Sequence, residues 1–214
     1  METRKVLFGA LLVCFAVSAS AAPITYDVTI NTSSMAGTAG SLDFNFSPGL
    51  LATQGASLQI LGFSSGGALA GSPEMTGDVS GALPSIITFD NGTGYNDYFE
   101  GFTYGSTLSF DVSLYGPALS SPNGVSTSGS TFAFSIFSDS AGTIPVLTND
   151  MTDGFAFLVN INLDGSTTTT NYSDQINVEP LSSAIPEPNN LLLVATGLTI
   201  LGVMSRQRRP MMDK

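Results

Sequence analysis

Apolar and polar residues alternate strictly in several segments of this chain, and this pattern restricts the fold more than any other feature. In residues 24–30, Ile24, Tyr26, Val28 and Ile30 alternate with polar neighbours. A period of two places successive side chains on opposite faces of a strand, so each segment has one buried and one hydrated face. The same alternation occurs in 42–46, 108–114, 132–136 and 155–161, and weaker strands are predicted at 57–63, 85–89, 98–104 and 174–178.

These segments predict an all-β body over residues 22–180. About nine short strands, separated by turns rich in Gly, Ser, Asn and Pro, are typical of an antiparallel β-sandwich, which we expect to be jelly-roll-like. Most of the 14 phenylalanines should form its core. The body has no segment with a clear helical periodicity and no repeat of fixed period. The expected helices are an N-terminal signal helix and a C-terminal transmembrane helix.

The body contains no positively charged side chain. Between Pro23 and Ser205 the sequence has no Lys, Arg or His, while 15 of its 17 acidic residues lie there, so this span carries a charge of −15. Nucleic-acid binding requires Lys and Arg to neutralise phosphates, which excludes nucleic acid as a partner. The same absence argues against nucleotide substrates and removes the side chains that usually act as general bases, Schiff-base amines and zinc ligands.

We therefore expect that the protein is not an enzyme. Glycoside hydrolysis is the one common reaction that carboxyl groups alone can catalyse, with two of them roughly 5–10 Å apart. Asp97 and Glu100 could form such a pair, but sugar-cleaving clefts usually add Arg, His or Trp, which the body lacks. A carboxylate-only glycoside hydrolase is the remaining enzymatic alternative.

The first 21 residues have the composition of a secretory signal peptide. Two basic residues precede an apolar run over 6–17, and a stretch of small residues follows. Ala19 and Ala21 fit the −3 and −1 positions of a signal-peptidase site, so we expect this peptidase to cleave after Ala21. The alternative is an uncleaved anchor. The single cysteine, Cys14, lies in the apolar run, so the mature chain would contain no thiol.

A second apolar segment lies near the C-terminus. Residues 190–205 are predicted to form a transmembrane helix, preceded by a linker over 181–189 and followed by a basic cytoplasmic tail over 206–214. The uncharged run is short for a bilayer core of about 30 Å, but flanking arginines can reach the headgroups. Clustered arginines favour the cytoplasmic side, which places the body outside the cytoplasm. The alternative is an ordinary single-span anchor.

The C-terminal residues resemble the PEP-CTERM sorting tail, which is also called the ice-binding protein C-terminal domain. Three features carry the resemblance: the tripeptide Pro186-Glu187-Pro188, the apolar segment, and the cluster of Arg206, Arg208 and Arg209. The resemblance implies an exosortase, a membrane transpeptidase, as a partner that processes the chain near the tripeptide. It also implies a Gram-negative bacterium that makes exopolysaccharide or biofilm. Residues 210–214 extend beyond the arginines further than is usual in such tails.

Three segments of the body, 41–49, 77–84 and 95–110, resemble a β-rich domain type that recurs among PEP-CTERM proteins and has no established activity. Together the resemblances imply an exported protein that is held transiently in the inner membrane and then lies at the cell surface or outside the cell. We expect a structural or adhesive role in an exopolysaccharide matrix. The alternative from another class is a carbohydrate-binding module.

Two acidic turns are candidate sites for a hard cation such as Ca²⁺, which takes six to eight oxygen ligands. One contains Asp90 and Asp97 and is followed by Glu100, and the other contains Asp150 and Asp153. Neither has the ligand spacing of an EF-hand loop. Asp and Asn also favour turns without any metal, so metal-free turns are the alternative for both.

Tyrosines in and beside the first acidic turn are candidates for carbohydrate binding. Tyr95 and Tyr98 are amphipathic rings that could stack on pyranose faces of an exopolysaccharide. The alternative is that they lie at strand ends with hydrated hydroxyl groups. Because a fold does not imply a function, the sequence leaves both interpretations open.

Overall fold

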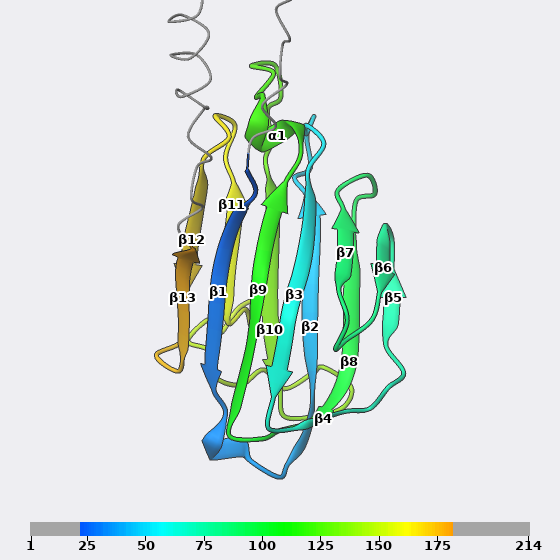
Figure 1. Cartoon of the computed structure of the whole chain (residues 1–214), viewed down its shortest axis with the longest axis vertical. Coiled ribbons are helices and arrows are strands. Elements are labelled where there is room, and N and C mark those ends of the chain that lie inside the picture. The colour runs from blue at the N-terminus through cyan, green and yellow to red at the C-terminus, as the bar shows by residue number, and fades with distance from the viewer. Residues whose placement is uncertain (1–21, 182–214) are drawn as a thin grey trace, which may run out of the picture.

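The computed structural model describes residues 22–181, which form two antiparallel β-sheets packed face to face (Figure 1). The first sheet has six strands in the order β13-β1-β9-β3-β7-β6. The second has seven, in the order β12-β11-β10-β2-β8-β4, with β5 also paired to β8. The strands are β1 (Ile24–Asn31), β2 (Ala39–Pro48), β3 (Ser57–Ser65), β4 (Ala68–Leu69), β5 (Glu74–Thr76), β6 (Val79–Gly81), β7 (Ile87–Asp90), β8 (Asp97–Thr103), β9 (Thr107–Tyr115), β10 (Ser130–Phe137), β11 (Phe157–Ile161), β12 (Thr167–Asn171) and β13 (Ile176–Leu181).

The all-β sandwich predicted from the alternation is confirmed, with more strands than expected. Each of the nine predicted segments overlaps a strand, and the structure adds β4, β5, β6 and β12. The first three of these have only two or three residues, too few for a period of two to be recognised. β12 is the four-threonine run with Asn171, a strand with no apolar residue that could show alternation. Two short helical segments are also present, η1 (Ser33–Met35) and α1 (Pro117–Ser120).

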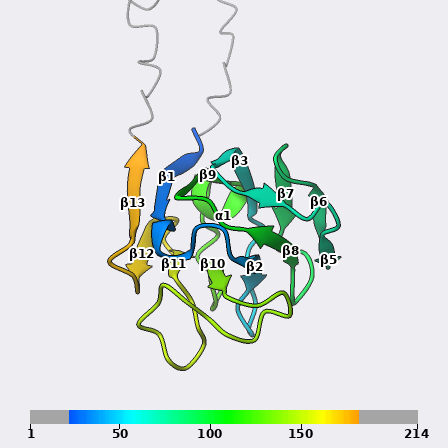
Figure 2. The same ribbon diagram turned by 90° about the horizontal axis from the view of Figure 1, so that it is seen from below.

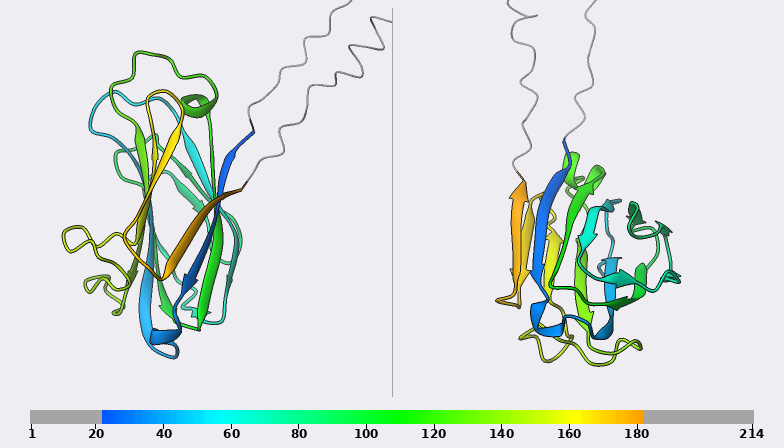
Figure 3. Two further views of the ribbon diagram at one scale, coloured as in Figure 1. Left: turned by 90° about the vertical axis from the view of Figure 1, so that its left-hand side faces the viewer. Right: turned by 60° about the horizontal axis from the view of Figure 1, so that its bottom comes forward.

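The chain changes sheets between consecutive long strands, and this ties the two layers together. β1 and β9 are neighbours in the first sheet, and the strands that follow them, β2 and β10, are neighbours in the second. The two sheets are seen nearly edge-on in the left view of Figure 3. Val28 lies opposite Phe110 in the first sheet, and Phe44 lies opposite Phe134 in the second, with all four side chains buried.

Phenylalanine rings from both sheets meet at the centre of the sandwich. Phe110 comes from the first sheet, and its ring centroid lies 5.2 Å from that of Phe44 and 5.1 Å from that of Phe134 in the second. Phe157 lies 5.6 Å from Phe134. Tilted and edge-to-face pairs of this kind add about 0.5–1.5 kcal/mol each to the gain from burial. The core therefore holds the two sheets in one relative position.

The described chain enters and leaves the sandwich at the same end. Thr25 in β1 lies opposite Leu181 in β13, and Ile24 lies opposite Leu114, which is close to the start of α1. We call this end the α1 end. It is formed by the connecting segments 49–56, 77–78, 91–96, 116–129 and 162–166.

The opposite end, which we call the η1 end, is formed by 32–38, 104–106, 138–156 and 172–175. Figure 2 views the molecule from this side and shows the long 138–156 connection extending beyond the sheets. Backbone bonds hold its ends against β10, because Ser138 N–H donates to the carbonyl of Ile144 (3.0 Å) and Val146 N–H to that of Ile136 (2.8 Å).

The predicted terminal segments lie almost entirely outside the described residues. These are the signal peptide over 1–21, the linker over 181–189, the transmembrane helix over 190–205 and the tail over 206–214. Only Leu181 of the linker is described, and it belongs to β13 rather than to a linker. Within 22–181, no helix is long and apolar enough to span a bilayer.

We expect Phe134→Ala to lower the free energy of unfolding by about 3–5 kcal/mol, because it opens a cavity among three aromatic neighbours. Urea denaturation at neutral pH measures the loss. Leu51→Ala is the matched control, since Leu51 is 66 % exposed, and it should change stability by less than about 0.5 kcal/mol. Equal effects of the two substitutions would contradict a core centred on Phe134.

Candidate functional site

The predicted ligands Asp90, Asp97 and Glu100 are not brought together. Asp90 ends β7 in the first sheet and accepts a hydrogen bond from the hydroxyl of Ser57. Asp97 begins β8 in the second sheet, on its outer face, whereas Glu100 points into the core and is 1 % exposed. A spacing of three residues places two side chains of a strand on opposite faces. In residues 22–181, no three side chains of His, Cys, Asp or Glu are grouped closely enough to hold a metal ion.

Asn96 holds the first acidic turn together through hydrogen bonds. Its side chain is fully buried, and Nδ2 donates to the carbonyls of Phe46 (2.9 Å) and Thr93 (3.0 Å). Its Oδ1 accepts from the backbone N–H of Asp78 (2.7 Å) and from the hydroxyl of Thr93. Gly77, with φ of +78°, allows the close approach, because a Cβ there would lie 2.5 Å from Asn96 Oδ1.

Tyr98 is not available to bind a carbohydrate, which corrects the sequence prediction. Its side chain is fully buried, and its hydroxyl donates to Glu100 Oε2 and accepts from the backbone N–H of Leu83 (3.1 Å). Gly71 N–H donates to the other carboxylate oxygen of Glu100 at 2.8 Å. Burial, with the hydrogen bond to Glu100, raises the pKa of Tyr98. Tyr95 is 53 % exposed and keeps an accessible ring.

Asp150 and Asp153 form a turn rather than a converging pair. Asp150 accepts hydrogen bonds from the backbone N–H groups of Thr152 (3.1 Å), Asp153 (3.2 Å) and Phe155 (3.3 Å). Slight desolvation acts to raise the pKa of Asp150, but these donors outweigh it and the pKa is lowered. The carboxylate of Asp150 therefore serves the turn itself, as in the metal-free alternative.

The most perturbed carboxyl group of the described chain is Asp43, which the sequence analysis did not single out. Asp43 lies on the outer face of β2, in hydrogen-bonding contact with Asp97 of β8. Burial is the main reason that the pKa of Asp43 rises to about 9, and the hydrogen bond and the negative charge of Asp97 act in the same direction. Asp43 Oδ1 and Asp97 Oδ1 are both buried without a donor. A proton on Asp43 supplies a donor to the pair, since the body has no cation to do so.

Tyr95 and Asn45 border the carboxyl pair. Asn45 lies opposite Asp97 in the ladder between β2 and β8, and its Oδ1 accepts from the hydroxyl of Ser47 (3.0 Å). Burial, then the charges of Asp97 and Asp43, raise the pKa of Tyr95 to about 12. The arrangement joins an exposed aromatic ring to an acid, a carboxylate and an amide. It can exchange a proton and offer hydrogen bonds to an uncharged polar ligand.

A second row of carboxylates crosses the outer face of the first sheet. Asp27 in β1 lies directly opposite Glu179 in β13 and directly opposite Asp111 in β9. Desolvation, followed by the charge of Asp27, raises the pKa of Asp111. Like charges on opposed positions destabilise a sheet, so this row costs stability. No Lys, Arg or His of residues 22–181 can offset it.

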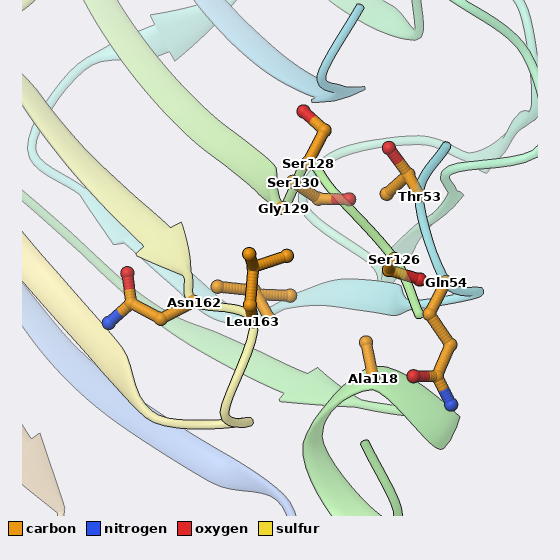
Figure 4. A pocket seen from close by; sticks show the side chains of 10 residues that line it. Thr53, Gln54, Ala118, Ser126, Ser128, Gly129, Ser130, Asn162 and Leu163 are labelled. Atoms are coloured by element: carbon orange, nitrogen blue, oxygen red, sulfur yellow. The ribbon is translucent and has the colours of Figure 1, made fainter. Parts of the chain in front are cut away.

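A small uncharged pocket lies at the α1 end, between the connections that follow β2, α1 and β11 (Figure 4). Its empty space, including open solvent, is about 230 Å³. Gln54 joins two of the connections, because its Nε2 donates to the carbonyl of Ser121 (2.9 Å) and its Oε1 accepts from Asn123 N–H (2.8 Å). The side chains that line it are Thr53, Gln54, Ala118, Ser126, Ser128, Ser130, Ile161, Asn162 and Leu163.

The described side chains offer carboxyl groups, hydroxyl groups, amides and apolar surfaces, with no Lys, Arg or His among residues 22–181. Asp97 and Glu100, the pair considered for glycoside hydrolysis, point to opposite faces of the second sheet and cannot flank one glycosidic bond. No protein-family model, curated protein or solved structure matches the chain. The predicted signal-cleavage residues Ala19 and Ala21 lie outside the described residues, as do the sorting residues Pro186, Glu187, Pro188, Arg206, Arg208 and Arg209.

We expect the stability of the body to fall by about 2–4 kcal/mol between pH 5 and pH 8 through Asp43. Well below pH 3.8, its ordinary pKa, the group is protonated in both the folded and the unfolded chain. Between that value and about 9 only the folded chain holds the proton, so rising pH favours unfolding. Urea denaturation at several pH values measures the slope.

Asp43→Asn tests this assignment, because the amide keeps a donor for Asp97 and cannot ionise. The variant should be more stable than the original chain at pH 8 and lose most of the dependence on pH. Asp174→Asn is the control for removing one negative charge, since Asp174 is exposed at the η1 end. An unchanged slope in Asp43→Asn would contradict proton sharing by this pair.

Asn96→Ala should lower the free energy of unfolding by about 2–4 kcal/mol, because it leaves buried backbone groups of the turn without partners. Thermal and urea unfolding both report the loss. Asn177→Ala is the matched control, since Asn177 is exposed and its side-chain amide donates to the carboxylate of Glu179 in the same strand. If both variants were equally stable, the turn would depend on some other interaction.

Proposed function

We propose that the chain is an exported, non-enzymatic surface or matrix protein that an exosortase sorts and processes. Its role would be structural or adhesive, in contact with exopolysaccharide. The proposal places the protein transiently in the inner membrane and then at the cell surface or outside the cell. One observation of the fold supports it above the others: the described chain enters and leaves the sandwich at the same end, where Thr25 lies opposite Leu181.

This arrangement suits a domain that is displayed from a membrane. A leader that precedes β1 and a sorting tail that follows β13 would both join the α1 end. The rest of the sandwich, about 33 Å along a ten-residue strand such as β2, would then project away from the attachment point. Removal of either terminal segment would leave the sheets intact, because both strands remain paired along their length.

The composition of the outer faces supports a structural or adhesive role. On the first sheet, Thr25 and Thr29 of β1 face outward beside Ser109 of β9, with Asp27 and Asp111 between them, whereas Ser113 is only 5 % exposed. Thr25 Oγ1 donates to Ser113 Oγ at 3.2 Å. Rows of hydroxyl groups offer hydrogen bonds to a hydroxyl-rich polymer. The negative charge repels anionic polymers unless divalent cations bridge the two.

A carbohydrate-binding module is the second proposal, and Tyr95 supports it. Its half-exposed ring lies beside Asp97, Asp43 and Asn45, so an aromatic face and several hydrogen-bonding groups occur together. That combination is common in sites that bind sugars through stacking and hydrogen bonds. We also propose that the sandwich is related to jelly rolls, since it consists of two antiparallel sheets.

Mass spectrometry of the mature protein from its own cells tests the sorting proposal. We expect a C-terminus near Pro186 or Glu187, with or without an added group, because processing near the tripeptide removes the arginine cluster. A variant with Pro186→Ala and Pro188→Ala should keep the arginines, whereas Pro210→Ala, outside the motif, should be processed normally. An intact arginine tail in the original chain would contradict exosortase processing and leave an ordinary membrane anchor.

A further inference from the structure

Four exposed aliphatic side chains lie in three connecting segments of the α1 end. Leu50 is fully exposed, and Leu51, Val125 and Leu163 are 66 %, 76 % and 52 % exposed. A backbone hydrogen bond joins the segment that contains Leu50 and Leu51 to the one that contains Val125, because Thr127 N–H donates to the carbonyl of Ala52 at 2.9 Å. Leu163 lies beside them, since it lines the pocket between these connections (Figure 4). We call Leu50, Leu51, Val125 and Leu163 the apolar tip.

The connecting segments around the tip carry little charge. Asp164 is the only charged residue in 49–56, 116–129 and 162–166. Elsewhere at the α1 end, Asp78, Asp90 and Asp97 lie beside the 91–96 segment, and the η1 end carries Asp139, Asp150, Asp153 and Asp174. The tip is therefore an uncharged aliphatic patch on a sandwich whose two ends are both acidic.

The chain also leaves the sandwich toward its predicted membrane span at the α1 end. β13 ends at Leu181, at the α1 end, and the uncharged apolar run starts at Leu191. Ten steps of extended chain reach about 35 Å at most. A tail embedded in a bilayer would therefore keep the exit of the chain, at the α1 end, within that distance of the lipid.

We propose that the apolar tip inserts into the interface of a lipid bilayer while the tail still anchors the chain. The proposal rests on the membrane-anchored stage of the proposed function. It does not depend on the later processing. The tether raises the local concentration of lipid around the tip, so a weak apolar contact is sufficient for docking. Docking orients the body with its sheets away from the membrane.

The chain contains no tryptophan, so a single introduced one reports the environment of one position. Leu51→Trp places the probe in the tip. Met151→Trp is the matched control, because Met151 is 91 % exposed at the η1 end. Each full chain, with its tail intact, is reconstituted into phosphatidylcholine vesicles that contain lipid brominated near the headgroup. Flotation with the vesicles is measured first, and quenching of the tryptophan emission by the brominated lipid is measured next.

We expect the Leu51→Trp chain to float with the vesicles and to be quenched at least about threefold more strongly than the Met151→Trp chain. Adding Leu50→Ser and Val125→Ser to the first chain should reduce its quenching. Adding Ile144→Ser, at the η1 end, should not. This pattern separates insertion of the tip from general adsorption of the body.

Three results overturn the proposal. Equal quenching of the two probes in floated protein shows that the tip does not contact lipid, whatever the fate of the tail in cells. A blue-shifted Leu51→Trp emission that depends on protein concentration and is not quenched shows that a second copy covers the tip. Failure to float shows that 190–205 does not anchor the chain, which removes the premise of this proposal and of the anchored stage. The C-terminal mass measured in cells distinguishes that failure from a failure of processing alone.

Discussion

The whole body must fold without a single positively charged side chain, and its polar structure depends on that constraint. In other proteins, a carboxylate that is removed from bulk water usually pairs with Arg or Lys. Here the available donors are backbone N–H groups, hydroxyl groups and protons. Glu100 uses Tyr98 and the N–H of Gly71, Asp150 uses three N–H groups of its own turn, and Asp43 keeps a proton. Each of these interactions is local, so each stabilises the strand or turn that contains it.

The two outer faces differ in how they meet this constraint. On the second sheet, Asp43 is covered well enough for its carboxyl group to stay protonated, and stability there is linked to pH. On the first sheet, Asp27 and Asp111 face each other across adjacent strands and are largely hydrated, so water and salt screen their repulsion. The first face is the better candidate for contact with a hydrated polymer, because its carboxylates and hydroxyl groups are accessible.

The fold class could be predicted from the sequence because a period of two is a property of single strands. The pairing of the strands could not be predicted, because it depends on the register between segments that are distant in the sequence. Asp43 and Asp97 lie 54 positions apart, and their contact follows from the pairing of Asn45 with Asp97. The burial of Tyr98, by contrast, could have been predicted from the sequence. Positions 98, 100, 102 and 104 are all buried, and a face assignment in this segment would have placed Tyr98 and Glu100 together in the core.

The same register argument explains why acidic residues that are close in sequence do not converge on one site. Asp90 and Asp97 are close in sequence, but β7 and β8 belong to different sheets, so the segment 91–96 bridges the two layers. A bridge of that kind needs partners for its buried backbone groups, and Asn91 and Asn96 supply them on the two sides. The composition that suits an oxygen-rich cation site is therefore also the composition that suits a crossing between the two sheets. Only the distances between the side chains distinguish a cation site from such a crossing.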